Sequence, residues 1–261
     1  MRMTKLIFIE GVSGAGKSTL VRNLAELLRE NGKTVRAWVE FDPTNPIDFY
    51  CTAALPIAEY EALAERYPEQ REALHRNMIP AGRWRLVRYY HGDDPVFPQP
   101  LLSELGEHEL CYHPKHPVSL ETYTEIYTAV WRGFAAELVN CQKDFLLFDG
   151  SSLHHPLNDM LRNYQVTEAQ AQRHVNAMLS SLGSVPRQTL YVKTEDIPAQ
   201  LAQAHADRGQ PAPTPEELCF WGTRRQYDRS VLSVLSEPCV YLDPSQGWNA
   251  MTQAAAAAIL T

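Results

Sequence analysis

Residues 11–18 (GVSGAGKS) bring three glycines, a lysine and a serine together at the spacing G-x-x-x-x-G-K-S. Such glycines let the backbone wrap around an anion, so that its N–H groups and the positive end of the next helix dipole point at phosphates. Lys17 can then reach the β- and γ-phosphates, and the Ser18 hydroxyl can complete a Mg²⁺ shell. The motif predicts a nucleoside triphosphate site for ATP and Mg²⁺. The residues expected to form it are Gly11, Val12, Ser13, Gly14, Ala15, Gly16, Lys17, Ser18 and Thr19.

An acid, Asp149, ends the apolar run at 144–148 and is followed by glycine. If that run is a strand beside the one before the phosphate loop, the carboxylate lies next to the loop at the carboxyl edge of the sheet. We therefore expect Asp149 to hold Mg²⁺ together with Ser18, directly or through water. The alternative is an acid that caps the following turn.

Two further acids, Glu40 and Asp42, follow the second predicted strand and are candidates for a catalytic base. A carboxylate within hydrogen-bond reach of an acceptor hydroxyl assists phosphoryl transfer, although positioning and charge neutralisation carry most of the rate. Glu40 is the first choice and Asp42 the second. The alternative is that both are solvated loop acids in front of Pro43.

Arginines lie between the fourth and fifth predicted strands, and we expect Arg208 and Arg224 to close on the phosphates and stabilise charge during transfer. The alternative places each of them on the surface.

His154 and His155 follow Asp149 closely and could touch substrate. The spacing of Cys111, His113 and His116 in residues 111–116 matches no four-ligand zinc template, so no metal other than Mg²⁺ is expected.

An Arg-aromatic cluster lies at residues 83–90 (RWRLVRYY). It could hold an aromatic or anionic acceptor. Alternatively it is a helix with its aromatic side chains packed inward and its arginines outside. The residue pattern leaves both interpretations open.

The composition is that of an enzyme in aqueous solution. The 261 residues carry a net charge of −7, and no basic run favours nucleic acid or an anionic membrane as a partner. No run of about 18 apolar residues exists to span a bilayer. Five scattered cysteines without a C-x-x-C pair indicate reduced thiols and a cytoplasmic location.

Alternating strand and helix patterns are expected to position these residues within a single domain, 1–261. Short apolar runs predict strands at 5–9, 34–39, 144–149, 188–193 and 238–242. Helical spacing predicts helices at 19–28, 119–141, 167–181, from 196, at 223–235 and from 248. A β-α-β unit at the start favours an α/β fold with a parallel sheet.

Ten prolines interrupt residues 43–117, with helical spacing only at 57–64 and 69–78. We expect this segment to be a largely helical insertion that caps the site and binds the acceptor. The turn-rich segment after the fourth strand, residues 205–224, is the candidate for a lid.

The phosphate loop at 11–18 resembles those of the P-loop small-molecule kinases, and is close to those of gluconate and adenylylsulfate kinases. Glu40 falls where deoxynucleoside kinases carry a base. Asp149 and Ser151 fall in the position of that family's acid-Arg-Ser triplet, with glycine in place of the arginine. The resemblance implies a three-layer P-loop fold, with a five-stranded parallel sheet of order 2-3-1-4-5 and a mobile lid over the phosphates.

The residues and the resemblance together predict an ATP- and Mg²⁺-dependent phosphotransferase. Its acceptor would be a hydroxyl or phosphate of a small molecule such as a nucleoside, nucleotide, sugar or antibiotic. The alternative is an NTP-hydrolysing switch that acts on a protein partner, although no N-K-x-D motif, no L-S-G-G-Q signature and no Glu after Asp149 is present. Three points stay open: the identity of the acceptor, whether ATP or GTP is the donor, and the oligomeric state, for which a homodimer is possible.

Overall fold

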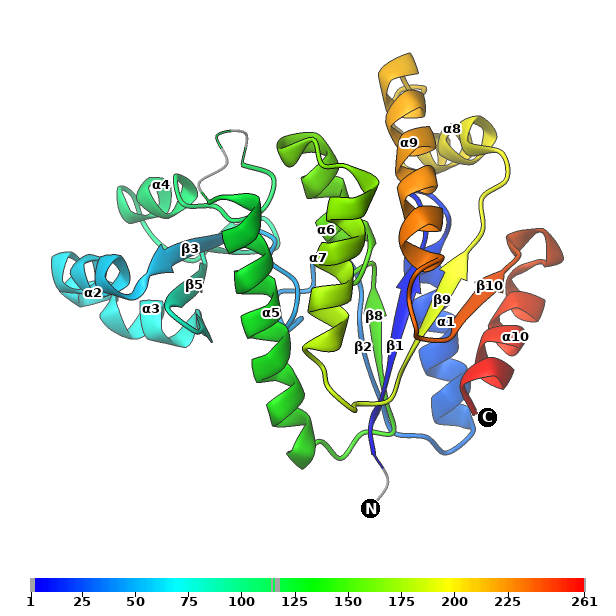
Figure 1. Cartoon of the computed structure of the whole chain (residues 1–261), viewed down its shortest axis with the longest axis horizontal. Coiled ribbons are helices and arrows are strands. Elements are labelled where there is room, and N and C mark those ends of the chain that lie inside the picture. The colour runs from blue at the N-terminus through cyan, green and yellow to red at the C-terminus, as the bar shows by residue number, and fades with distance from the viewer. Residues whose placement is uncertain (1–2, 114, 116–117, 261) are drawn as a thin grey trace.

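The computed structural model describes residues 3–113, 115 and 118–260. A parallel sheet forms its centre (Figure 1). The strands of this sheet are β1 (Lys5–Glu10), β2 (Val35–Trp38), β8 (Phe145–Asp149), β9 (Arg187–Val192) and β10 (Cys239–Leu242). The expectation of an α/β fold with a five-stranded parallel sheet is confirmed.

The strands lie in the order β2-β8-β1-β9-β10, and every neighbouring pair is parallel. Numbered among the five strands of this sheet alone, the order reads 2-3-1-4-5; the labels run higher because β3 to β7 belong to the segment between β2 and β8. Strand β1 therefore lies between β8 and β9. Its carboxyl end, where the glycine-rich loop 11–16 begins, has the ends of both neighbours beside it.

Both faces of β1 are buried, as expected for a central strand of a parallel sheet. Ile7 and Ile9 pack on one side, in the cluster that includes residues of helices α1 (Lys17–Glu30) and α10 (Trp248–Leu260). Leu6 and Phe8 pack on the other side, where Phe8 stacks on Trp131 with a centroid distance of 5.4 Å. The continuous apolar run of the strand follows from this two-sided burial.

Helices cover both faces of the sheet. Helices α5 (Leu120–Glu137), α7 (Glu168–Ser180) and α9 (Pro215–Leu232) lie on the face opposite α1 and α10 (Figure 1). Short helical turns η2 (Leu138–Asn140) and η4 (Pro244–Gln246) join elements at the periphery. Helix α6 (His154–Asp159), which continues as a π-helical turn η3 (Met160–Tyr164), and helix α8 (Ile197–Asp207) lie near the carboxyl edge.

The part of the chain between β2 and α5 is a mixed α/β insertion at one side of the sheet, so the expectation of a largely helical insertion is wrong (Figure 1). An antiparallel sheet β3-β5-β4 forms its centre, and a small hairpin follows. Its strands are β3 (Thr52–Pro56), β4 (Met78–Ala81), β5 (Trp84–Arg88), β6 (Tyr90–His91) and β7 (Asp94–Pro95). Its helices are α2 (Ile57–Arg66), η1 (Pro68–Gln70), α3 (Arg71–Arg76) and α4 (Leu101–Gly106).

Strand β5 shows why the helical interpretation of residues 83–90 is wrong. Leu86 and Val87 are both fully buried although adjacent residues of a strand point to opposite faces, because each face of β5 is covered by a different apolar cluster. Burial on both faces removes the alternation that would have identified a strand. The helical spacing at 57–64, by contrast, is confirmed by α2.

Side-chain caps fix the starts of several helices. Ser119 accepts a hydrogen bond from the Thr122 N–H at 3.2 Å, which confirms the predicted start of α5. Helix α9 begins eight residues before the predicted Thr223, because Thr214 and Glu217 form a capping box around Pro215. The predicted lid at 205–224 therefore consists of the end of α8, the loop 208–214 and the first half of α9.

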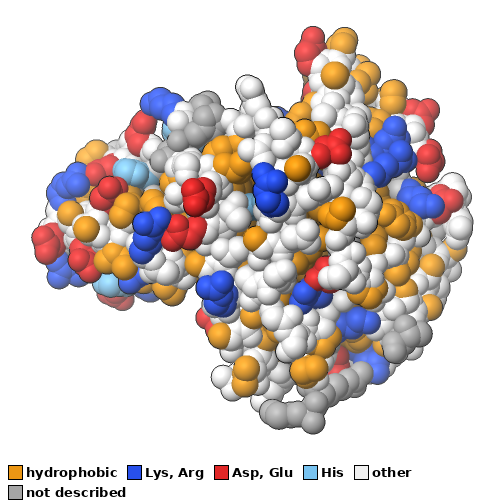
Figure 2. Space-filling view, viewed as in Figure 1, with side chains coloured by type: hydrophobic (Ala, Val, Ile, Leu, Met, Phe, Trp, Pro, Cys, Tyr) orange, Lys and Arg blue, Asp and Glu red, His pale blue; other side chains and the backbone are white. Residues whose placement is uncertain are grey.

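Charged side chains of both signs lie interspersed over the face drawn in Figure 2. Within residues 3–113, 115 and 118–260, no helix has both the length and the apolar character that crossing a bilayer requires. The five cysteines carry free thiols, and Cys111 is the buried one among them.

Candidate nucleotide and magnesium site

The loop at residues 11–16 connects the carboxyl end of β1 to the start of α1. Gly14 and Gly16 have φ angles of +73° and +89°, which L side chains rarely adopt. A Cβ on Gly14 would lie 2.7 Å from the Cβ of Ala204, and one on Gly16 would lie 2.1 Å from the Trp248 ring. Both glycines are therefore required by geometry and by the close approach of α8 and α10.

The start of α1 has no side-chain cap among the described residues. The first N–H groups of a helix lack intrahelical partners and carry the positive end of its dipole. Together with the left-handed glycines, this leaves a concave run of backbone donors, as an anion site requires. The Val12 and Ala15 side chains point away from this concavity into the apolar core, so the two residues contribute only backbone.

Lys17 is the first residue of α1 and is only 6 % exposed. Its Nζ donates to the Val12 carbonyl oxygen at 3.2 Å and lies 3.3 Å from Nδ1 of His154. The side chain thus curls back over the loop. Its ammonium group lies inside the concavity, where a bound phosphate would compete for it.

Ser18 and Asp149 meet at the edge of the sheet, because β1 and β8 are neighbours with Ile9 opposite Asp149. The Ser18 hydroxyl donates to Asp149 Oδ2 at 2.5 Å, and the Glu40 N–H donates to the same oxygen at 3.3 Å. Asp149 is 1 % exposed, and its Oδ1 is buried without a hydrogen-bond partner among the described residues. A buried carboxylate oxygen with no partner is costly unless a cation or donor reaches it.

A cavity of about 490 Å³ opens over the loop and is bounded by α1, α8, His154 and Trp248. It brings together most of the predicted nucleotide-binding residues with Glu40 and Arg208. The full lining consists of Ser13, Gly14, Gly16, Lys17, Ser18, Thr19, Arg22, Glu40, His154, Gln200, Gln203, Ala204, Asp207, Arg208 and Trp248. Gly11 lies deeper, against the Val192 carbonyl of β9.

The structure separates the two candidate bases. Glu40 lines the cavity, whereas Asp42 does not. Asp42 Oδ1 instead accepts hydrogen bonds from the N–H and the hydroxyl of Thr44, at 2.9 and 2.7 Å. Asp42 is thus a turn residue in front of Pro43, as in the alternative interpretation, which leaves Glu40 as the candidate base that lines the cavity.

The two predicted arginines also differ. Arg208 is exposed and lines the cavity just beyond the end of α8. Arg224 is 0 % exposed and forms an ion pair with Asp228 one turn later on α9. Arg224 is thus paired with Asp228 inside the protein, while its Nε and Nη2 are buried without a hydrogen-bond partner among the described residues. That Arg224 acts on phosphates stays a prediction.

Sequence reasoning missed three residues of the site. Glu10 ends β1 and is fully buried; its carboxylate accepts hydrogen bonds from the Ser152 N–H and hydroxyl and from the His154 N–H, at 2.7 to 2.9 Å. Burial raises the pKa of Glu10 above its ordinary value, while these donors act against the rise. The signal was available, since Glu10 ends an apolar strand just as Asp149 does.

Trp221 and Trp248 are the other two missed residues. Trp221, on α9, stacks on the His154 ring with centroids 5.5 Å apart. Trp248 begins α10 and is 43 % exposed, with its ring against the phosphate loop. Neither has a local sequence signal, because each reaches the loop from an element far along the chain.

The Arg-aromatic cluster at 83–90 is used within the protein. Arg83 forms a two-bond ion pair with Glu125 of α5. Arg88 donates to the backbone carbonyls of Pro43, Asn45 and Asp48, which ties the insertion to the loop after β2. These contacts give Arg83 and Arg88 structural roles.

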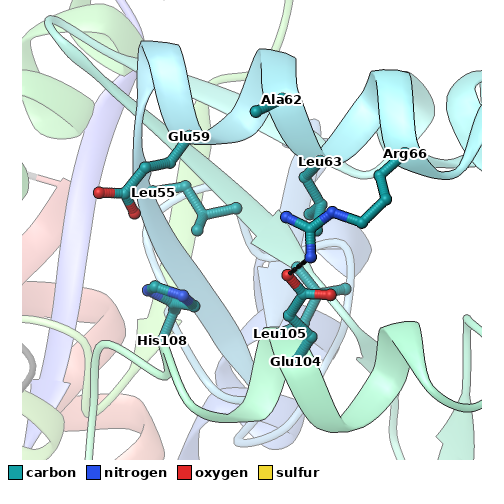
Figure 3. A pocket seen from close by; sticks show the side chains of 8 residues that line it. All are labelled: Leu55, Glu59, Ala62, Leu63, Arg66, Glu104, Leu105 and His108. Carbon is teal, nitrogen blue, oxygen red and sulfur yellow. Dashed lines mark hydrogen bonds and ion pairs between the residues drawn. The ribbon is translucent and has the colours of Figure 1, made fainter.

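A second cavity, of about 130 Å³, lies within the insertion between α2, β3 and α4 (Figure 3). Figure 3 shows Glu59 and His108 at one end and the ion pair of Arg66 with Glu104 at the other, over an apolar floor that includes Leu55. None of its lining residues comes from the main sheet or the phosphate loop. The cavity is thus separate from the candidate site.

Among the described residues, no group of three or more His, Cys, Asp or Glu side chains is arranged to hold a metal ion. His116, part of the Cys111-containing segment considered as a zinc site, lies outside the described residues. Only one of the two adjacent histidines lies at the cavity. His154 lines it, whereas His155 Nε2 lies 3.8 Å from Asp48 Oδ2.

The site therefore consists of a glycine-rich loop at a helix start, a lysine held over it, and a serine and a carboxylate side by side. Comparison of the sequence with models of known protein families, and with curated protein sequences, finds no match.

Proposed function

We propose that the protein is an ATP- and Mg²⁺-dependent phosphotransferase of the P-loop type, which transfers a phosphoryl group to a hydroxyl or phosphate of a small molecule. The observation that supports this most directly is the Ser18 hydroxyl 2.5 Å from Asp149 Oδ2, at the mouth of the glycine loop that carries Lys17. Phosphoryl transfer relies on such positioning and charge neutralisation rather than on covalent chemistry by the protein.

The loop would bind the triphosphate through its backbone N–H groups and through Lys17. Lys17 Nζ would exchange its contacts with Val12 and His154 for phosphate oxygens, which are charged and therefore stronger acceptors. Arg208, which lines the same cavity, supplies a second cation for the charge of the transferred group. The exposed ring of Trp248 offers a flat apolar surface for the base of the nucleotide.

The residues present fit a magnesium ion. Ser18 and Asp149 are oxygen donors of the kind that Mg²⁺ prefers, and the buried Asp149 Oδ1 without a partner is what an absent cation or its water would leave. These two side chains would hold the ion, with phosphates and water completing its shell. When bound, Mg²⁺ neutralises the negative charge of the phosphoryl group while that group passes from donor to acceptor.

Glu40 is the proposed base. It lines the cavity from the end of β2, and its own N–H is tied to Asp149, so the backbone at Glu40 is fixed relative to the metal-holding carboxylate. A carboxylate there could accept the proton of an acceptor hydroxyl as the new bond to phosphorus forms. The insertion, which adjoins the end of β2, would then provide the acceptor side.

A kinase is favoured over a hydrolysing switch because glycine, not glutamate, follows Asp149. Gly150 has a φ of +70°, and a Cβ there would lie 2.8 Å from the Cβ of His154. A glutamate that activates water could not occupy this position without moving α6. The backbone at Gly150 thus argues against a water-activating glutamate directly after Asp149.

The test is ADP release from Mg·ATP by the purified protein, with and without a panel of nucleosides, nucleotides, sugars and antibiotics. Lys17→Ala serves as the blank. Lys143→Ala, an exposed lysine at the opposite edge of the sheet, serves as the matched control. We expect one acceptor class to stimulate ADP release and to gain one phosphoryl group, in wild type and Lys143→Ala alone. ADP release that only a protein partner stimulates would favour the switch instead.

A further inference from the structure

The imidazole of His154 lies between two groups of the phosphate loop. Its Nδ1 is 3.1 Å from the carbonyl oxygen of Gly11 and 3.3 Å from Nζ of Lys17. The first group can only accept a hydrogen bond from the ring, and the second can only donate one to it. A single ring nitrogen therefore faces two partners with opposite requirements.

The ring is held firmly in this orientation. Its plane lies 11° from that of Trp221, whose indole covers one face. The His154 N–H donates to Glu10 Oε2 at 2.9 Å, which fixes the start of α6 to the end of β1 directly before the loop. Gly150 lies so close to His154 that a Cβ on Gly150 would come within 2.8 Å of the His154 Cβ. The orientation of Nδ1 is thus set by three elements, and the ring cannot turn away from the loop without disturbing them.

The environment of the His154 imidazole favours its neutral form. Burial, and then the nearby Lys17 ammonium, lower the pKa of His154 well below its ordinary value. A neutral imidazole carries its one proton on either Nδ1 or Nε2. Nδ1 can accept from Lys17 or donate to Gly11, and it cannot do both at once.

We propose that His154 is a positioning residue for Lys17 that changes tautomer with nucleotide binding. While the loop is empty, Nδ1 accepts from Lys17 and the ring proton is on Nε2. When Lys17 turns to the phosphates, Nδ1 takes the proton and donates to the Gly11 carbonyl. This inference rests on the proposed binding of a triphosphate by residues 11–18.

The exchange gives Nδ1 of His154 a new partner, the Gly11 carbonyl, when the nitrogen loses Lys17. Without it, departure of Lys17 would leave an unpartnered buried nitrogen facing an unpartnered carbonyl, and each such group carries a desolvation penalty. The new bond also ties α6 to the loop at Gly11, the residue that begins the phosphate cradle. His154 would thereby hold the lysine ready in the empty protein and stiffen the loop in the occupied one.

The test is the tautomer of His154, read from two-bond ¹⁵N–¹H correlations of the imidazole in ¹⁵N-labelled protein. His154→Phe, which keeps a ring against Trp221, assigns the signal among the nine histidines. If that variant does not fold, His154→Asn assigns it. We expect Nε2–H in the free protein and Nδ1–H with Mg·ATP. In Lys17→Ala we expect Nδ1–H already without nucleotide, because the competing donor is gone.

Calorimetry on the same samples separates the two hypotheses. If Mg·ATP binds the wild type but the tautomer does not change, the inference is overturned and the proposed function stands. If the free wild type and Lys17→Ala share one tautomer, the inference is likewise overturned. If Mg·ATP does not bind at all, the proposed function is contradicted and the inference falls with it.

Discussion

The buried pair of Arg224 and Asp228 on α9 gives the sharpest prediction about stability. Both side chains are 0 % exposed, and Asp228 Oδ2 also accepts a hydrogen bond from the Tyr191 hydroxyl at 2.8 Å. Removal of one partner of a buried ion pair leaves an uncompensated charge, which typically costs about 3–5 kcal/mol. We expect Arg224→Met to lower the free energy of unfolding by roughly that amount.

The corresponding change in melting temperature follows from the size of the chain. At about 2.1 cal/mol/K per residue, the unfolding entropy of 261 residues is about 0.55 kcal/mol/K near the midpoint. A loss of about 3–5 kcal/mol therefore lowers Tm by about 5–9 °C. Arg208→Met, at an exposed position in the cavity, should change Tm by much less and should lower turnover instead.

Circular dichroism melts of the single variants and of the double variant Arg224→Met/Asp228→Asn provide the assay. The double variant removes both charges, so it should regain a large part of the stability lost in Arg224→Met. An unchanged Tm for Arg224→Met together with lost turnover would refute this reasoning, because the arginine would then act on substrate. So would a double variant less stable than the sum of the two single effects.

The stability lost in Arg224→Met should depend on pH, and the direction of that dependence follows from the pKa of Asp228. Burial raises the pKa of Asp228 above its ordinary value, and Arg224 acts against that rise. A carboxyl group with a raised folded-state pKa contributes stability below its unfolded pKa and loses it as the pH rises through the folded one. Without Arg224 the pKa rises further, so the loss in Arg224→Met should be larger at about pH 8 than at about pH 5. A loss that grows on acidification would contradict this.

The remaining predictions concern the cavity. Asp149→Asn should raise the Mg²⁺ concentration for half-maximal activity by about tenfold or more, measured by magnesium titration; an unchanged midpoint would exclude this carboxylate as a ligand. Glu40→Gln should lower turnover by about 10²–10⁴ with the KM for ATP unchanged; if steady-state kinetics show only weaker acceptor binding, Glu40 positions the acceptor. Gly16→Ala should weaken Mg·ATP binding in calorimetry, since its Cβ would lie 2.1 Å from the Trp248 ring; unchanged binding would mean that the ring moves freely.

The main sheet and the strand, loop and helix at residues 5–30 were predictable because their signals are local. An apolar strand, three glycines with a lysine and serine, and an amphipathic helix follow one another within residues 5–30. Asp149 could be placed beside the loop because parallel strands end at a common edge. The helix starts at Ser119 and Thr167 likewise depend on a few neighbouring residues, and both starts are confirmed.

The insertion and the buried charges were not predictable for a physical reason. Strand β5 is covered on both faces, so its sequence carries no alternation. Arg224 and Arg208 look alike in sequence. Arg224 is buried where α9 packs against β9, whereas Arg208 lies just beyond the end of α8 and is exposed. His154 gains its position from contacts with Glu10, Gly11 and Trp221, which are distant along the chain.

The measurement that tests the nucleotide site most directly is isothermal titration calorimetry of Mg·ATP with wild type, Lys17→Ala and Lys143→Ala. A hydrogen bond to a charged group contributes about 1.5–3 kcal/mol, so loss of Lys17 should weaken binding by about 10- to 150-fold. Lys143→Ala should bind as the wild type does. Absence of binding by the wild type, or equal binding by a folded Lys17→Ala, would contradict a triphosphate site at residues 11–18.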